Sequence, residues 1–575
     1  ITLEKNKKTN ILGSIVQQPE TWSVWDGEIP KESTLTTDPE NQNRYIIDEA
    51  DDVAWLSVQE NAQSLAANST FIMTVDVDMN NGSGLAAIQL PSGSILDGDG
   101  HTIKGLQLEN ALLGDVTDIT VKNLTIEETT VANTSADVTH IGVLVNTLKG
   151  SNTFSNIHIK SSSVSTQNGA AGGIVGYISR KDPNNREETL TVTFDDCHVT
   201  ETTVSGTQSE GHFVGLLRGY DNKETLQFNN NCTLTLSATV RSADEFVSPY
   251  REGNEGAWLA DNDYSKYNGW LGDEECYRGT VMYGDKRFIP CWDGITKITP
   301  LTDGTTKLIY SAFDLASLQG SGHAAVTFKE DVDLGGDRAT NKNPFTPIST
   351  ISTLDGGDKT IYNLYINVTN WIGAFIGASS GTTSHKNLNF SNSSVLVKPS
   401  SGSELAYAAT LCAYIEGSYT AENIKIDNAY VLGISKSGGL NGYVTSGTTF
   451  YTAKQCSVNN LRLENSYLHL TGETFAASGE MGGLVGFIQQ SALVESCSVT
   501  NSVINCSNSV LRHVNQFIGT IRLDNSPHRI DINKCSVSGN IYENKKDEKS
   551  KFVGGYSLSS LLQRGKVYID GTRLR

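Results

Sequence analysis

One short segment, residues 481–504, is repeated with variation along this chain. It contains two apolar runs, at 484–488 and 497–504, which polar residues typical of turns separate. The second run alternates apolar and polar residues, and a period of two predicts a strand with one buried face. Neither run is long enough to form a stable hairpin by itself. We therefore expect copies of the segment to stack and to cover one another's apolar edges.

Both halves of the segment recur. The glycine-rich half returns at 141–148, 172–179, 211–217, 372–379, 438–444, 517–523 and 552–558. The second half recurs nine times, and the apolar position that we expect to face the interior holds Leu124, Ile157, Cys197, Cys232, Leu388, Ile424, Leu461, Cys497 and Cys535. Asn or Asp precedes that position in seven copies, at Asn123, Asn156, Asp196, Asn231, Asn387, Asn423 and Asn460, whereas Ser496 and Lys534 precede it in the other two. Gly483, Gly519 and Gly554 lie 36 and 35 residues apart, a spacing typical of a solenoid.

Two copies depart from the pattern. Asn441 interrupts the apolar part of the sequence GGLNG, and 406–414 has no glycine. Cys456 also fits the pattern of the apolar position, in a register that competes with that of Leu461. The register of these copies stays open at this point.

The repeat resembles that of the GLUG-motif proteins, bacterial surface or secreted chains named for a Gly-Leu-Val-Gly-like sequence. The best matches are 482–486, GGLVG, and 172–176, GGIVG. The motif is short and structural, so the resemblance implies architecture and export rather than an activity. We expect an all-β fold of tandem right-handed parallel β-helix (solenoid) domains with short N-terminal capping helices, the handedness following from the general rule for parallel crossovers.

The composition limits the possible functions. The chain has 575 residues, too many for one typical compact core, and its formal net charge of −20 disfavours binding to nucleic acid, whose phosphates carry the same sign. No apolar run is long enough to form a transmembrane segment. The chain begins at Ile1 and shows no export signal; we infer a secreted or outer-surface location in a Gram-negative bacterium from the resemblance, with an export signal or lipid anchor removed.

Cysteines have two interpretations in this sequence. Those in the apolar position, such as Cys197 and Cys497, are expected to be buried thiols that act as small hydrophobic groups. Cys276 and Cys291 lie in an irregular stretch and could form a disulfide in an exported protein. No Cys-x-x-Cys spacing is present, and we expect no metal site and no cofactor.

Several segments occur twice in the same order, which indicates duplication of a whole domain. The sequence WDG at 25–27 matches 292–294, TVDVDM at 74–79 matches KEDVDL at 329–334, LDGDGHTIKGL at 96–106 matches LDGGDKTIYNL at 354–364, and KNLTIEETTV at 122–131 matches KNLNFSNSSV at 386–395. Apolar residues at helical spacing predict a short helix in each copy, at 48–58 and 311–318, with Asp48 and Ser311 as the N-caps. The expected division is a leader or tail at 1–21, a first β-helix domain at 22–245, an aromatic-rich insertion or linker at 246–291 and a second β-helix domain at 292–575.

The insertion holds the candidate ligand-binding residues. Trp258, Tyr264, Tyr267 and Trp270 lie close together in sequence, and exposed rings of this kind stack on sugars. The alternative, which we favour, is that the rings bury one another and hold an irregular segment in place.

Carboxylate pairs are the other candidates for chemistry. Asp195-Asp196 with Gly211-His212 faintly resembles elements of the pectin-hydrolysing β-helix enzymes, but the repeat explains these residues without catalysis. The pairs Asp76/Asp78 and Asp331/Asp333 share strand faces, and their recurrence in both copies favours a role in the scaffold, such as capping turns. A tight turn is the better interpretation of LDGDGHT, in which Asp97, Asp99 and His101 loosely resemble a calcium loop. We assign no catalytic residue.

Three functions remain. The first is a non-enzymatic, adhesin-like binding protein on the cell surface or secreted, contacting glycans or host or bacterial surface proteins. The second is a polysaccharide lyase or glycoside hydrolase on a β-helix scaffold, and the third is a structural spacer. Exposed Trp and Tyr side chains favour the binder, whereas carboxylates converging in a groove with Arg or Lys favour the enzyme.

Overall fold

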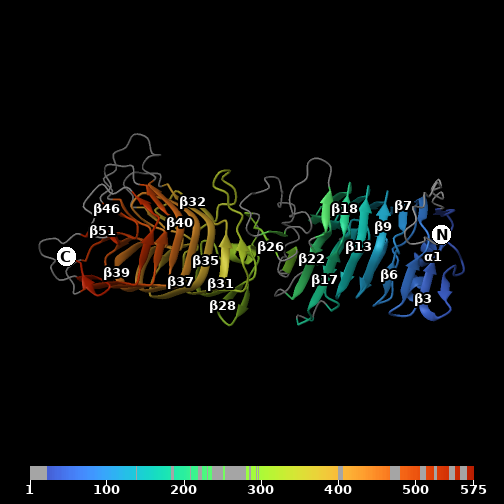
Figure 1. Cartoon of the computed structure of the whole chain (residues 1–575), viewed down its shortest axis with the longest axis horizontal. Helices are drawn as coiled ribbons and strands as arrows, with labels where there is room; N and C mark the ends of the chain where they lie inside the picture. The colour runs from blue at the N-terminus through green and yellow to red at the C-terminus, as the bar shows by residue number, and fades with distance from the viewer. Residues whose placement is uncertain are drawn as a thin grey trace, which may run out of the picture. The chain divides into compact units, whose positions relative to one another are not determined.

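The computed structural model shows a chain that is mostly β, with large parallel sheets and very little helix. It describes residues 22–137, 139–182, 185, 187–207, 209–217, 223–229, 231–235, 250–252, 280–283, 286–292, 294–295, 297–398, 406–465, 479–505, 513–523, 528–542, 551–556 and 566–574. Two compact units are present: unit 1 comprises Ile1–Leu216 with Gln227–Val240, and unit 2 comprises Leu217–Leu226 with Arg241–Arg575. Within each unit the strands lie side by side in chain order (Figure 1).

The elements up to residue 235 are α1 (Ala50–Leu56), α2 (Gln59–Gln63), β1 (Ser23–Val24), β2 (Thr36–Asp38), β3 (Asn41–Ile47), β4 (Thr70–Met73), β5 (Val77–Gly82), β6 (Ile95–Asp97), β7 (Thr102–Leu108), β8 (Leu113–Thr117), β9 (Thr120–Glu127), β10 (Thr130–Asn133), β11 (Ile141–Gly142), β12 (Val145–Lys149), β13 (Asn152–Lys160), β14 (Ser163–Thr166), β15 (Ala170–Gly172), β16 (Val175–Ser179), β17 (Leu190–Asp195), β18 (His198–Thr200), β19 (Thr203–Gly206), β20 (Ser209–Gly211), β21 (Val214–Leu217), β22 (Glu224–Phe228) and β23 (Thr233–Thr235).

The later elements are α3 (Ala312–Ala316), β24 (Tyr250–Glu252), β25 (Thr280–Tyr283), β26 (Lys286–Pro290), β27 (Leu301–Asp303), β28 (Thr306–Ile309), β29 (Gly322–Phe328), β30 (Val332–Asp333), β31 (Thr350–Tyr362), β32 (Tyr365–Val368), β33 (Ile372–Gly373), β34 (Ile376–Ser379), β35 (Thr382–Val397), β36 (Tyr407–Ala408), β37 (Cys412–Gly433), β38 (Lys436–Gly438), β39 (Asn441–Lys454), β40 (Ser457–Asn465), β41 (Glu480–Gly482), β42 (Val485–Ile488), β43 (Ala492–Glu495), β44 (Ser498–Thr500), β45 (Val503–Asn505), β46 (His513–Asn515), β47 (Ile518–Ile521), β48 (Arg529–Asn533), β49 (Ser536–Ser538), β50 (Ile541–Tyr542), β51 (Val553–Tyr556), β52 (Lys566–Ile569) and β53 (Thr572–Arg573).

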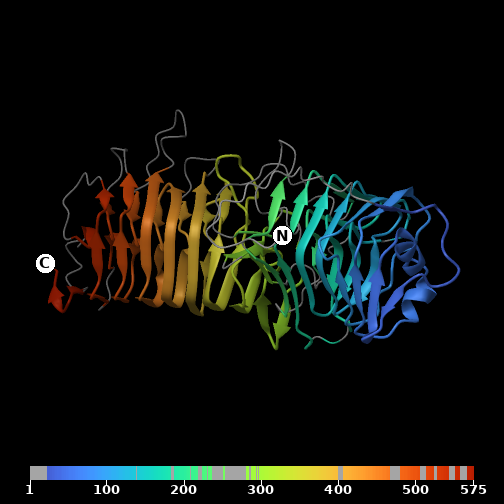
Figure 2. The same cartoon turned by 45° about the vertical axis from the view of Figure 1, so that its right-hand side comes forward.

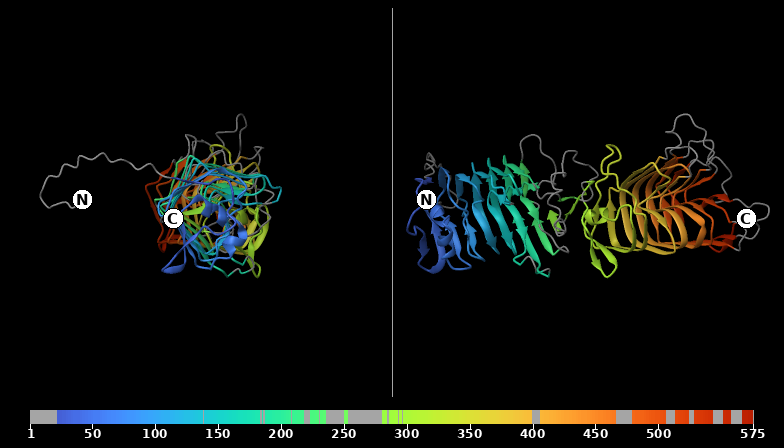
Figure 3. Two further views of the ribbon diagram at one scale, coloured as in Figure 1. Left: turned by 90° about the vertical axis from the view of Figure 1, so that its right-hand side faces the viewer. Right: turned by 180° about the vertical axis from the view of Figure 1, so that it is seen from behind.

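Parallel pairing links each strand to its counterpart one repeat later. In unit 1, Ile157 of β13 lies opposite Leu124 of β9, and in unit 2, Ile424 of β37 lies opposite Leu388 of β35. The views from the other sides show the same side-by-side order within each unit (Figure 3). Inside the expected insertion, the described strands β24, β25 and β26 pair antiparallel instead. The parallel pairing expected of the stacked repeats is therefore confirmed in both units.

The predicted interior column is buried. The nine side chains named for it are at most 1% exposed, except Cys535, which is partly exposed. One assignment was wrong: Ser457 pairs with Lys425 and Lys454 with Glu422, so Cys456, not Leu461, stands next to Ile424. Leu461 lies opposite Ala429 instead. Both side chains are buried, which is why the sequence alone could not separate the two registers.

The Asn/Asp position before this column has a backbone reason. Asn123, Asn156, Asp196, Asn387 and Asn423 all have φ between 51° and 55°, in the left-handed region where Asn and Asp are tolerated best. The side chains also bond between copies: Nδ2 of Asn156 donates to Oδ1 of Asn123 at 3.1 Å, and Nδ2 of Asn423 donates to Oδ1 of Asn387 at 3.1 Å. The position turns the chain at a corner of each repeat.

The copies that broke the pattern keep the same backbone. Gln455, Ser496 and Lys534 have φ of 51° to 53°, so the corner is left-handed whatever residue occupies it. A second left-handed column, missed in the sequence, comprises Asn363, Asn392, Asn428, Asn460 and Asn501. Asn460 belongs to this second column, since its Nδ2 donates to Oδ1 of Asn428 at 3.2 Å.

The helix predictions are confirmed with one change. Ser311 caps α3: its hydroxyl accepts the N–H of Asp314, and Oδ2 of Asp314 accepts the N–H of Ser311 at 2.9 Å. In the first copy the N-cap is Glu49 rather than Asp48, because Oδ2 of Asp52 accepts the N–H groups of both residues and α1 starts one residue later. Figure 2 shows α1 beside the first strands of unit 1.

The matched segments make matching contacts in the two units. The N–H of Trp25 donates to the carbonyl of Asp78 at 2.9 Å, and the N–H of Trp292 donates to the carbonyl of Asp333 at 2.9 Å. Both indole rings are buried. The sequence matches therefore correspond to the same local structure twice.

Asn441 has a structural reason as well. It lies opposite Cys412 and Val485 in the normal register and is fully buried. Its Oδ1 accepts the hydroxyl of Tyr451 at 2.8 Å, and its Nδ2 lies 3.3 Å from the hydroxyl of Tyr419. A polar residue in the apolar run thus satisfies two buried tyrosines. The glycine-free copy also pairs regularly, with Tyr407 of β36 between Ile372 and Lys436.

Candidate binding surface

The candidate ligand-binding residues of the insertion are not described. Trp258, Tyr264, Tyr267 and Trp270 lie outside the described residues, as does Cys276. The proposed sugar contacts and the Cys276–Cys291 disulfide therefore stay predictions. Cys291 itself is buried.

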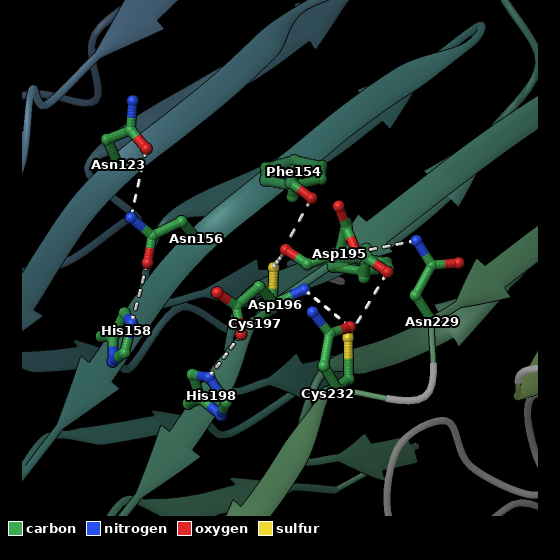
Figure 4. Close-up of polar contacts among 12 residues, drawn as sticks. Asn123, Phe154, Asn156, His158, Asp195, Asp196, Cys197, His198, Asn229 and Cys232 are labelled. Atoms are coloured by element: carbon green, nitrogen blue, oxygen red, sulfur yellow. Dashed lines mark hydrogen bonds and ion pairs between the residues drawn. The ribbon is translucent and has the colours of Figure 1, made fainter.

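The Asp195-Asp196 pair belongs to the repeated corner of unit 1 (Figure 4). Asp196 has φ of 51°, like Asn123 and Asn156, and its Oδ1 lies 3.1 Å from Nε2 of His198. Oδ1 of Asp195 accepts Nδ2 of Asn229 at 2.8 Å. These carboxylates hold neighbouring parts of the repeat in place, and the arrangement supports the scaffold interpretation over a catalytic one.

One carboxylate of each other pair binds a backbone N–H group of the following repeat. Oδ1 of Asp76 accepts the N–H of Thr102 at 2.8 Å, and Oδ1 of Asp331 accepts the N–H of Thr360 at 2.7 Å. The recurrence of these residues in both copies thus reflects the same backbone contact made twice, which supports a scaffold role.

The sequence LDGDGHT forms the expected tight turn. Oδ1 of Asp97 accepts the N–H of Asp99, whose φ is 48°. Burial alone raises the pKa of Asp97, but the hydrogen bonds from Lys122 and Asn123 outweigh it and lower that pKa below its usual value. Asp97 is therefore a carboxylate engaged with its own neighbours.

The part of the chain that the structure describes contains no group of three or more His, Cys, Asp or Glu side chains placed to hold a metal ion. Among those residues there is also no helix with the length and apolar character needed to cross a bilayer.

Unit 2 carries a column of aromatic rings that arises directly from the repeat. Successive parallel strands β34, β37, β39 and β42 place Ala378, Tyr414, Tyr443 and Phe487 opposite one another. Ring centroids are 5.8 Å apart between Tyr414 and Tyr443, and 5.5 Å apart between Tyr443 and Phe487. One in-register position thus gives neighbouring rings on three successive strands.

A second column lies against the first. In the sheet formed by β33, β36, β38 and β41, Ile372, Tyr407, Lys436 and Glu480 follow one another in register. The Tyr407 ring is 5.7 Å from that of Tyr414 and 5.1 Å from that of Tyr443. The two columns therefore form one continuous cluster.

Trp371 extends the cluster toward solvent. Its side chain lies just before β33 and is 46% exposed, although it is large and apolar. Its ring meets those of Tyr407 at 5.8 Å and Tyr414 at 6.0 Å, both edge to face. The indole thus packs against both rings while much of it stays open to solvent. We name Trp371, Tyr407, Tyr414, Tyr443 and Phe487 together the aromatic surface, in which Trp371 is exposed, Tyr414 and Tyr443 are partly exposed, and Tyr407 and Phe487 are buried.

Lys436 is held within the aromatic surface. Its Nζ lies 4.5 Å from the ring centroid of Tyr443 and 5.1 Å from that of Phe487, which are cation–π distances. Burial lowers the pKa of Lys436, while the carboxylate of Glu480, its neighbour across the strands, acts in the opposite direction. The rings stabilise the ammonium group of a lysine that is only 9% exposed as a whole residue.

Polar side chains run alongside the rings. Glu416, Thr445, Gln489 and Arg522 each follow a member of the first column or its continuation by two residues; Thr445 is buried, and the other three are at least partly exposed. The hydroxyl of Tyr414 donates to Oε1 of Glu416 at 2.8 Å, and that of Tyr443 donates to Gln489. Burial, and then the Glu416 carboxylate, raises the pKa of Tyr414 to about 12, so its phenol is a donor at neutral pH.

This surface was missed in the sequence, although a signal for it was present. In the glycine-rich half an aromatic residue follows the glycine at Tyr443, Phe487 and, in unit 1, Tyr177. In unit 1 the Tyr177 ring lies 4.7 Å from that of His140. An aromatic residue that recurs at one position of a stacked repeat predicts neighbouring rings. This prediction needs the pairing register of the copies, which the sequence left open.

Comparison with known proteins adds no relative to these observations. No protein-family model, curated protein or solved structure gives a significant match to this chain.

Proposed function

We propose that this chain is a non-enzymatic binding protein, exposed on a bacterial surface or secreted, that contacts glycans through the aromatic surface of unit 2. The observation that carries the proposal is the 46% exposure of Trp371, held edge to face by Tyr407 and Tyr414. An exposed, fixed indole beside hydroxyl and carboxylate groups provides both an apolar face and hydrogen-bonding groups. Sugars offer the same two kinds of surface.

The scaffold that we propose for this function is a right-handed parallel β-helix in each unit. Each strand pairs in parallel with the strand one repeat later, and the apolar side chains form buried columns. Handedness rests on the general rule for parallel crossovers. The resemblance to GLUG-motif proteins supports both the coil and the surface location, and the adhesin-like role is part of the same proposal.

The carboxylates of the aromatic surface support binding rather than hydrolysis. The carboxylate of Glu416 accepts a hydrogen bond from Tyr414, and Glu480 neighbours the Lys436 ammonium. A glycosidase needs one carboxylic acid held protonated opposite a second carboxylate. Both carboxylates are instead close to groups of the aromatic surface, Glu416 to the Tyr414 hydroxyl and Glu480 to the Lys436 ammonium.

A glycan array read with the intact protein and two variants tests the proposal. Trp371→Ala removes the exposed indole, and Phe450→Ala serves as the matched control because Phe450 is 43% exposed on β39. We expect Trp371→Ala to weaken binding to array hits by about tenfold or more, the loss of roughly 1.4 kcal/mol of contact, and Phe450→Ala to leave it unchanged.

Two results would contradict the proposal. Binding that survives Trp371→Ala, or no binding to any glycan, would remove the aromatic surface as a glycan site and leave the spacer as the better function. Release of reducing sugar ends from a bound polymer would instead show a polysaccharide-cleaving enzyme.

A further inference from the structure

We infer that unit 1 binds a divalent transition-metal ion, of the kind that prefers imidazole ligands, between His158 and His198. Imidazole is the commonest metal ligand in proteins, and it suits Zn²⁺, Ni²⁺ and Cu²⁺. Both histidines belong to unit 1 alone, whereas the glycan proposal concerns unit 2. The two proposals therefore stand or fall separately.

The register of the repeat brings the two rings together. His158 of β13 lies opposite His198 of β18 in parallel pairing. The ring centroids are 4.7 Å apart, and both side chains are partly exposed. Each metal–nitrogen bond is about 2.0–2.1 Å long, so one ion can join two ring nitrogens that lie about 4 Å apart or less. Because the two histidines come from successive repeats, folding is what places them side by side.

A chain of amide groups fixes the tautomer of His158. Nδ2 of Asn123 donates at 3.0 Å to Oδ1 of Asp97, an ionised carboxylate that can only accept. Oδ1 of Asn123 then accepts Nδ2 of Asn156 at 3.1 Å, which turns Oδ1 of Asn156 toward Nε2 of His158, also at 3.1 Å. An amide oxygen can only accept, so in the neutral ring Nε2 of His158 carries the proton and Nδ1 carries the lone pair.

His198 is held in the same tautomer. Its Nε2 lies 3.1 Å from Oδ1 of Asp196, which occupies the corner position that Asn156 occupies one repeat earlier. The carboxylate accepts the proton of Nε2, so the lone pair of the neutral ring is on Nδ1. In Figure 4, each ring turns one nitrogen toward its own corner residue and the other away from it. A carboxylate behind a metal-binding histidine also makes the ring a better ligand.

The charges at the pair favour a cation. Burial, followed by the neighbouring His198 and Lys160, lowers the pKa of His158, so its ring is neutral at neutral pH. A metal ion needs a neutral imidazole, because a protonated ring has no lone pair to offer. The Asp196 side chain is 51% exposed beside the pair, and the whole chain has a formal net charge of −20. Both attract a cation to the site.

The pair supplies two protein ligands, fewer than the four of a structural zinc centre, so water would complete the coordination. An ion held in this way would join β13 to β18 and stabilise unit 1, since it binds the folded chain in preference to the unfolded one. Mg²⁺ prefers oxygen ligands and should not bind there.

Isothermal titration of the metal-free full chain with Zn²⁺ tests the inference. We expect a site for one ion per chain whose affinity falls about tenfold or more in His158→Gln and in His198→Gln. The double variant should lose little more than either single variant, because one imidazole alone cannot chelate the ion. Mg²⁺ in place of Zn²⁺ should give no binding at this site.

Two further variants separate a metal site from a structural contact. Asp196→Asn keeps a residue that suits the corner but removes the carboxylate behind His198, and should weaken Zn²⁺ binding about tenfold. His101→Gln is the matched control, since that ring is also partly exposed and lies 3.2 Å from a carboxylate oxygen, of Asp76, rather than beside a second histidine. It should leave Zn²⁺ affinity unchanged.

Far-UV circular dichroism and the melting temperature without metal show whether each variant is folded. Electron paramagnetic resonance of bound Cu²⁺ gives a second measurement: two coupled nitrogen nuclei are expected in the parent chain and one in either histidine variant. Zn²⁺ affinity that is unchanged in both histidine variants, or that falls equally in His101→Gln, would overturn the site. Failure of both Zn²⁺ and Cu²⁺ to bind the parent chain would overturn it as well, and would leave the glycan proposal untouched.

Discussion

A single backbone requirement explains the most regular position of the repeat, the Asn or Asp before the interior column. The residue before the interior column adopts φ of 51° to 55° in eight copies, whether it is Asn, Asp, Gln, Ser or Lys. Asn and Asp dominate because they tolerate this conformation and because their side chains bond to the next copy. The second such column shows that the repeat turns twice in this way.

Substitutions at Asn423 separate these two effects. Asn423→Val forces a β-branched residue to φ of 51° and removes the bonds to Asn387 and Asp358, so we expect a loss of about 2–3 kcal/mol in the free energy of unfolding. Asn423→Gly keeps the backbone accessible and should lose only about 1 kcal/mol. Urea unfolding followed by far-UV circular dichroism measures both, and equal losses would show that the conformation is unimportant.

Asn441 provides a second test at a single residue. Asn441→Val restores the apolar pattern of the repeat but leaves the buried Tyr451 hydroxyl without its acceptor, so we expect a loss of about 1–3 kcal/mol. Tyr451→Phe in the same chain removes that hydroxyl and should recover part of the loss. Additive effects in a double-mutant cycle would contradict the hydrogen bond.

At the scale of elements, the strands β35, β37 and β39 share a buried polar chain. Nε2 of His385 lies 2.8 Å from the carbonyl of Ile351, and its Nδ1 lies 3.2 Å from the Tyr419 hydroxyl. The Tyr419 and Tyr451 rings are stacked at 5.8 Å with an angle of 2°. His385 is fully buried, and burial lowers its pKa to about 4.

This histidine gives unit 2 a pH dependence of known sign. Between an unfolded pKa of 6.5 and a folded pKa of about 4, the unfolded chain binds the proton that the folded chain excludes, so stability falls as the pH is lowered through this window. The full drop is about 3 kcal/mol. Urea midpoints from pH 7 to pH 4 should fall less in His385→Gln than in the parent chain. An unchanged slope would mean that His385 is protonated in the folded state.

Much at this scale could be predicted from the sequence. The buried column from Leu124 to Cys497 and the cap at Ser311 follow from local pattern, and the parallel pairing follows from the stacking of repeated segments. The choice between Cys456 and Leu461 did not, since both fit the period and only the neighbouring strand decides. The aromatic surface required knowledge of which copies lie in register, and Trp371 stands outside the motif altogether.

Across the whole molecule, the number of neighbours differs from strand to strand. In unit 2, β37 pairs with β34, β35, β39 and β40, whereas the described pairing of β49 is to β44. A strand with partners on both edges opens only when those partners open as well. We therefore expect its amide groups to be better protected from hydrogen exchange than those of a strand with fewer partners.

Hydrogen exchange followed by mass spectrometry checks this gradient. Peptides from β37 should exchange more slowly than peptides from β49 and β50 by about tenfold or more. The same sequence positions compared in the fully unfolded chain control for intrinsic exchange rates. Equal protection in both regions would show that unit 2 opens only as a single body.

The short separation along the chain between paired strands has a consequence for how the protein folds during synthesis. Leu388 pairs with Ile424, and Cys456 lies next to Cys497, so these neighbours are only 36 and 41 residues apart along the chain. A ribosome, or a pore that threads the chain from its N-terminus, would release each new strand onto an edge that is already formed. Each new strand can thus pair with the preceding repeat as it emerges, before the rest of the chain has been released.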